Sequence, residues 1–174
     1  SVLVYDDHGG EAALDAAEHL ALLGARVELV TPERTVGISV GSMNSPAYLA
    51  AFAAHDVVLT VARRLDGVRR ARPDEPGSLV ATLSSEYADA ARERVVDHVV
   101  VEHGTVPNDE LYLDLVAGSR NLGAVDHDAL LAVQPQQGAT NPDGTYQLFR
   151  IGDAVASRNV HAAIYDALRL CVTV

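Results

Sequence analysis

The sequence predicts an α/β sandwich with a mostly parallel sheet, because three stretches of the chain follow the patterns of that fold. A strand, a helix and a second strand follow one another within the first thirty residues. Short strands joined by turns occupy residues 65–96, and an unbroken valine run at 99–101 is typical of a strand buried on both faces. Apolar residues make up 48% of the chain and charged residues 21%, as in globular proteins.

The first thirty residues have the size of a right-handed βαβ crossover. The apolar run at 2–5 predicts a buried strand, and alanines and leucines at helical spacing predict a helix over 11–23. Gly24 stands where a left-handed helix cap is expected. A second strand over 26–30 ends before Pro32.

The later elements are predicted in the same way. Pro46 fits the first turn of a helix over 47–54. The next strands are expected at 57–61, 65–72, 78–84, 92–96 and 99–101, of which the middle three would form an antiparallel meander. After a stretch rich in turn residues, we expect a strand over 146–151 and a helix over 160–171.

Together these elements predict a Rossmann-like nucleotide-binding domain of the disulfide-reductase type, with a parallel sheet plus a three-stranded antiparallel meander.

Charge and cysteine content exclude several classes of partner. Lys and Arg total 13 against 24 Asp and Glu, which gives a net charge of −11, whereas nucleic acids and anionic membranes bind clustered positive charge. The single Cys171 excludes a disulfide within the chain and a cysteine-ligated zinc or iron–sulfur site. The sequence has no apolar run of membrane-spanning length, so we expect a cytoplasmic protein without nucleic-acid or membrane partners. Because a strand begins at the second residue, we also expect the sequence to be cut from a longer one; the alternative is a short N-terminal strand in a complete protein.

The first strand–helix turn is where a dinucleotide pyrophosphate would bind, on the helix N-terminus. This turn holds only Gly9 and Gly10 of the glycine-rich motif, and Asp6 and Asp7 precede them. Carboxylates close to a pyrophosphate would repel it. Thr31 stands where an acidic side chain would bind the ribose. We therefore expect that this domain does not bind NADH or NADPH.

The segment around Gly152 and Asp153 carries the candidate cofactor-binding residues. The glycine would let the backbone approach a nucleotide closely, and the aspartate would accept hydrogen bonds from hydroxyl groups. The helix that begins near residue 160 would direct backbone N–H groups, those of His161 and Ala162, at a phosphate or flavin. The alternative is an ordinary strand–turn–helix with a capping aspartate.

The histidines give no metal site and no catalytic residue. Asp126 and Asp128, on either side of His127, are interpreted as helix caps, and Glu102–His103, at the end of a strand, is interpreted as structural.

Two segments resemble a known family. Residues 99–112 are similar to the strand-to-exit segment of the pyridine-nucleotide-like domain, and residues 149–156 to the Gly-Asp segment of the FAD-type domain, of the NADH:flavin oxidoreductases. This family is built like trimethylamine dehydrogenase, histamine dehydrogenase and 2,4-dienoyl-CoA reductase, and includes N-methylproline-type demethylases. The resemblance implies a preceding barrel that carries FMN and an iron–sulfur cluster, and two nucleotide-binding-like domains, the second inserted into the first. On that layout, residues 1–106 would form the inserted NAD(P)-binding-like domain, with a degenerate glycine loop. Residues 107–174 would be a returning strand–helix segment of the other such domain, the C-terminal part of an FAD- or ADP-binding-like domain. The shortened turn resembles the amine-dehydrogenase branch, which has lost dinucleotide binding.

The resemblance implies the C-terminal region of an amine-oxidising or demethylating enzyme, inactive by itself. No cofactor is expected in this chain, apart from ADP or an FAD-like nucleotide at Gly152 and Asp153. The partner would be the N-terminal FMN barrel domain, in the same or a separate chain. Because the last helix has an apolar side, residues 141–174 are expected to pack onto the first domain or to pair with a second copy as a homodimer. The alternative function is a self-contained nucleotide-binding or docking module that partners a separate redox subunit.

Overall fold

The computed structural model describes residues 1–138 and 140–172, which form two compact units, Ser1–Gly104 and Thr105–Val174. The division falls two residues before the boundary expected from the sequence. No helix in the described part of the chain is both long enough and apolar enough to cross a membrane. The two units are described separately below.

The first unit is built on a four-stranded parallel sheet. Its strands are β1 (Val2–Asp6), β2 (Val27–Val30), β3 (Val58–Thr60) and β7 (His98–Glu102), in the order β3-β2-β1-β7. At the centre of the sheet, Val4 lies opposite Leu29 on one side and Val100 on the other. The chain therefore pairs one edge of β1 with β2 early, and pairs the other edge with β7 roughly seventy residues after β2.

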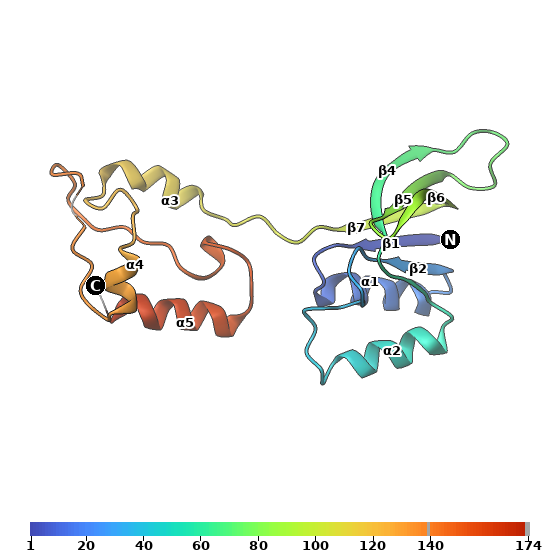
Figure 1. The fold of residues 1–174 in the computed structure, drawn as a ribbon, viewed down its shortest axis with the longest axis horizontal. Coiled ribbons are helices and arrows are strands. Elements are labelled where there is room, and N and C mark those ends of the chain that lie inside the picture. Colours follow the sequence, from blue (N-terminus) through green and yellow to red (C-terminus); the bar gives the residue numbers. More distant parts are fainter. Residues whose placement is uncertain (139, 173–174) are drawn as a thin grey trace. The chain divides into compact units, whose positions relative to one another are not determined.

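Layers of different kinds cover the two faces of this sheet (Figure 1). Val2 and Val4 pack against α1 (Glu11–Leu22) and α2 (Ser45–Ala54), whereas Leu3 and Tyr5 pack towards the meander. The meander consists of β4 (Arg64–Arg70), β5 (Leu79–Ser85) and β6 (Ala88–Val96), paired antiparallel. Because successive side chains of a strand point to opposite faces, a continuous apolar run suits a strand between two layers. The predicted α/β fold class is confirmed.

The turn between β4 and β5 is held by an ion pair. Val80 is completely buried, although it belongs to neither of the two cores that flank the parallel sheet. Between β4 and β5, the Glu75 carboxylate accepts hydrogen bonds from the Arg69 guanidinium at 2.7 and 2.9 Å, and from the Arg72 backbone N–H at 2.6 Å. The Arg69 hydrogen bond is the main cause that lowers the pKa of Glu75 from 4.5 to about 2. An ion pair thus holds the turn in place.

The second unit has short helices and no sheet among its described residues. The elements are α3 (Glu110–Leu115), α4 (His127–Leu131) and α5 (Val160–Cys171), with 3-10 turns at Val116–Gly118 and Gly152–Ala154. The helices predicted near residues 127 and 160 are confirmed, and Asp126 caps α4 by accepting from the Ala129 N–H at 3.0 Å.

The strand predicted over 146–151 is wrong. Here the described residues form a single bridge, between Ser119 and Tyr146. A strand needs a neighbouring strand to satisfy its backbone, and this unit supplies a side chain instead. The buried Asn121 carboxamide accepts from the Leu148 N–H at 2.9 Å and donates to the carbonyl oxygens of Leu148 and Ala124 at 2.8 and 2.9 Å. A side-chain amide thus takes the place of a backbone partner.

Candidate functional site

The turn between β1 and α1 lies at the carboxyl end of the parallel sheet. Asp6, only 1% exposed, ends β1, and its Oδ1 accepts hydrogen bonds from the backbone N–H groups of His8 at 3.1 Å and Gly9 at 2.8 Å. Gly9 has φ +78°, and a Cβ there would lie 2.5 Å from the Ile38 side chain, so this position requires glycine. The backbone donors of the turn are therefore directed at a carboxylate of the same chain.

The residue that follows β7, His103, contacts the β1–α1 turn. The His103 Nδ1 lies 2.8 Å from both carboxylate oxygens of Asp7, and the His103 ring meets the Tyr5 ring edge-on at 5.8 Å. Glu102 accepts a hydrogen bond from the Gly104 N–H at 2.5 Å. Both acidic groups thus have local partners, which fits the structural interpretation of Glu102 and His103. Across the described residues, no group of three His, Cys, Asp or Glu side chains is placed to hold a metal ion.

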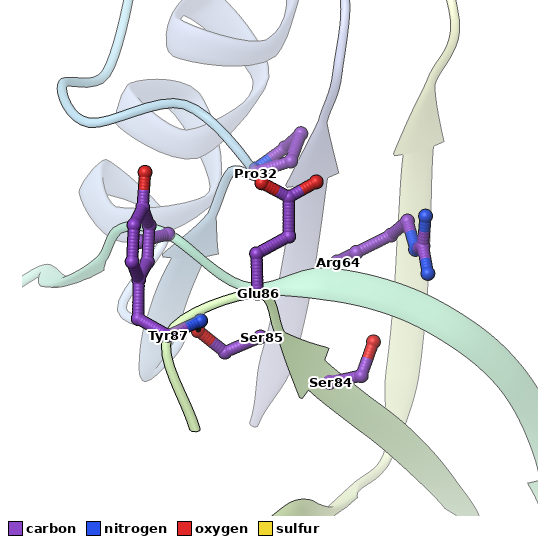
Figure 2. A pocket seen from close by; sticks show the side chains of 7 residues that line it. Pro32, Arg64, Ser84, Ser85, Glu86 and Tyr87 are labelled. Atoms are coloured by element: carbon purple, nitrogen blue, oxygen red, sulfur yellow. Dashed lines mark hydrogen bonds between the residues drawn. The ribbon is translucent and has the colours of Figure 1, made fainter. Parts of the chain in front are cut away.

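A pocket of about 200 Å³ lies beyond the end of β2, towards the meander (Figure 2). The Thr31 side chain, at the end of β2, is buried, and its hydroxyl accepts a hydrogen bond from the Glu33 N–H at 3.2 Å. The pocket has one cationic and one anionic side chain, two serine hydroxyl groups and a tyrosine ring with its hydroxyl, contributed by Pro32, Ala62, Arg64, Ser84, Ser85, Glu86 and Tyr87. Sequence reasoning missed Glu86, because the hairpin that carries it comes from far along the chain.

In the second unit, Gly152 packs closely against α5. It is buried with φ +58°, and a Cβ at this position would lie 3.1 Å from the Cβ of Ala163. The Gly152 N–H donates to Asp166 at 3.2 Å, and Arg158 also binds Asp166. The hydrogen bond from Arg158 is the main cause that lowers the pKa of Asp166. A positive φ and a close helix together explain why glycine stands here.

The structure brings only some of the other expected site residues together. Asp153 is exposed and makes no hydrogen bond or ion pair with any described residue. It borders a groove of about 470 Å³ along the start of α5, with Arg158, Asn159, Val160, Ala163, Ile164 and Ala167. His161 and Ala162 do not line this groove, and the Ala162 N–H already donates to the Asn159 side chain at 2.8 Å. Asn159 is the helix cap, a role that its position just before an apolar helix could have revealed.

The chain is similar in sequence to parts of longer proteins. No protein-family model matches it. It is 49% identical, over 170 residues, to a probable N-methylproline demethylase of Rhizobium meliloti; these residues are 98% of this chain and 24% of the relative. It is 44% identical, over 175 residues, to an N,N-dimethylglycine/sarcosine dehydrogenase of Chromohalobacter salexigens, covering 98% of this chain and 25% of the relative. The chain thus spans about a quarter of the length of these curated relatives.

Solved structures share the fold at low sequence identity. A 6-hydroxypseudooxynicotine amine oxidase from Pseudomonas geniculata superposes with a TM-score of 0.66 at 19% identity, over 99% of this chain and 21% of its own. A histamine dehydrogenase from Rhizobium sp. 4-9 superposes with a TM-score of 0.64 at 22% identity, over 97% of this chain and 22% of its own. A ferredoxin reductase from Rhodopseudomonas palustris superposes with a TM-score of 0.51 at 22% identity, over 65% of this chain and 26% of its own. The resemblance predicted from the two short segments is confirmed: nearly the whole chain is similar to one part of enzymes that include an N-methylproline demethylase and a dimethylglycine/sarcosine dehydrogenase.

Proposed function

We propose that this chain is the C-terminal nucleotide-binding-like region of a larger FMN- and iron–sulfur-dependent oxidoreductase that oxidises or demethylates an amine. The observation that carries the proposal is the 49% identity to a probable N-methylproline demethylase along 98% of the chain. The region contributes no catalytic residue and does not turn over substrate by itself. Its single cysteine supplies only one of the thiolates that a cluster needs, so the cluster and FMN belong to an N-terminal barrel domain in the cytoplasmic protein.

The two units differ in their relation to nucleotides. Ser1–Gly104 is an NAD(P)-binding-like domain whose turn is occupied by its own carboxylate. Thr105–Val174 is part of an FAD- or ADP-binding-like domain and contributes Gly152 and Asp153 to one side of an adenine-nucleotide site. The exposure of Asp153, its lack of a partner among the described residues and its place beside the start of α5 fit the binding of nucleotide hydroxyls.

The N-terminal domain would also cover an apolar surface. Ile164 and Leu168 are 63% and 62% exposed on one side of α5. An apolar helix face of this kind calls for a covering partner, and the barrel domain of the longer protein would provide one.

The test uses the full-length protein with N-methylproline, sarcosine and N,N-dimethylglycine. Oxidation removes two electrons and a proton from the N-methyl group, and FMN would accept the two electrons. Water then hydrolyses the resulting iminium to formaldehyde and the demethylated amine. We expect flavin absorbance, bound iron and formaldehyde release in step with amine consumption. A full-length protein without flavin, or one that turns over none of these amines, would contradict the proposal.

A further inference from the structure

The buried carboxylate of Asp6 has one oxygen with partners and one without. Oδ1 accepts the two backbone hydrogen bonds of the β1–α1 turn. Oδ2 is also buried, yet it has no hydrogen-bond partner among the described residues. A buried carboxylate oxygen without a partner costs free energy, so packing alone does not account for an aspartate at this position.

The location of Asp6 is the one where open α/β sheets bind ligands. The chain leaves β1 towards β2 on one side, while β7 lies on the other side, so the strand order reverses at β1. Ligands of such sheets bind outside the carboxyl ends of the strands at this reversal, with phosphates on the backbone N–H groups that precede the helix. In this chain the N–H groups of His8 and Gly9 bind Asp6 instead.

We propose that the Asp6 carboxylate is a built-in substitute for a ligand phosphate. It keeps the turn in an anion-binding conformation and excludes pyrophosphate from it. Any incoming phosphate would have to displace Asp6 and would also meet the charge of Asp7, which His103 holds at 2.8 Å. Only the identity of the excluded ligand, a pyrophosphate, rests on the proposed nucleotide-binding-like function of this unit. The hydrogen bonds from the turn to Asp6 do not depend on that function.

Substitutions at Asp6 separate its charge from its hydrogen bonding. Asp6→Asn keeps an oxygen that can accept both hydrogen bonds, so the turn stays occupied and pyrophosphate stays excluded. Asp6→Ala and Asp6→Gly remove both the charge and the acceptor, and leave the two N–H groups free for an anion. Asp74→Ala is the matched control, because it makes the same change in charge at an exposed position outside this turn.

The experiment is an NMR titration of the full chain with inorganic pyrophosphate, followed at the backbone amides of His8 and Gly9. We expect Asp6→Ala and Asp6→Gly to bind at least about tenfold more tightly than the unmodified chain, while Asp6→Asn and Asp74→Ala bind no more tightly than it does. The proposal is overturned if the folded Asp6→Ala variant gains no binding, if Asp74→Ala gains as much, or if the unmodified chain already binds through these amides.

A measurement on the unmodified chain remains decisive if the Asp6 variants do not fold. The backbone amides of His8 and Gly9 should show NMR scalar coupling, across their hydrogen bonds, to the side-chain carboxyl carbon of Asp6. If neither amide shows this coupling, the internal contact itself is overturned. Neither measurement depends on amine turnover, so failure here and failure of the proposed function can be told apart.

Discussion

Replacing Asn121 by alanine tests how the second unit is held together. The side chain is only 2% exposed and makes three hydrogen bonds, two to the backbone of Leu148 and one to Ala124. Each such bond contributes about 1 kcal/mol net, and a buried backbone group left without a partner costs about 1–3 kcal/mol. Because Leu148 is only partly buried, water can replace some of what is lost. We therefore expect Asn121→Ala to destabilise this unit by about 2–3 kcal/mol.

The assay is amide hydrogen exchange at Leu148, because the chain has two units and a single unfolding curve would average over them. The expected loss corresponds to exchange about 30- to 150-fold faster. Gln134→Ala is the control, because this exposed amide makes one long hydrogen bond of 3.4 Å and should change stability by about 0.5 kcal/mol or less. If exchange at Leu148 in the folded variant matches that of the control, Asn121 does not substitute for a strand neighbour.

Three further predictions follow from the structure. Asp153→Ala should leave the melting temperature of this chain unchanged, since Asp153 has no partner among the described residues, but should lower the nucleotide content of the full-length protein. Unfolding of this chain by the substitution would instead make Asp153 a structural cap. Because the pKa of Glu75 is lowered to about 2, its ion pair with Arg69 should stabilise the turn above pH 4.5 and be lost as the pH falls towards 2. A carboxyl NMR titration checks this, and Arg69→Gln should move the midpoint back towards 4.5. The purified 174-residue chain should be colourless, and flavin absorbance that persists through gel filtration would contradict this.

Most of the first unit could be predicted from the sequence because its signals are local. The apolar run at 2–5 predicts a buried strand, and all four residues are buried as expected. The prediction that the valine run at 99–101 is buried on both faces is wrong: β7 is an edge strand of the parallel sheet, and Val101 is 43% exposed. Gly24 has φ +84° and follows α1 as a left-handed residue should. Strand ends do not follow from the apolar pattern alone: β6 begins four residues before the predicted 92–96, since cross-strand pairing extends it beyond its apolar part.

The errors and omissions have a common physical origin in contacts between distant residues. Residues 146–151 have the composition of a strand, but the composition says nothing about a neighbour, and here Asn121 takes the place of one. In the same way, Asp6 could be recognised as unfavourable for pyrophosphate, but not as the group that occupies the turn. The pairing of Asp7 with His103 joins residues 96 positions apart, which no local pattern reveals.

The central position of β1 has a consequence for folding during protein synthesis. One edge of β1 pairs with β2, which is complete by Val30, whereas the other edge waits for β7, which ends at Glu102. Until the ribosome has made β7, the backbone of Leu3, Val4 and Tyr5 therefore presents an open strand edge, flanked by apolar side chains, for roughly seventy residues of elongation. At elongation rates of about 5–20 residues per second this lasts several seconds, long enough for a nascent-chain chaperone to engage the edge.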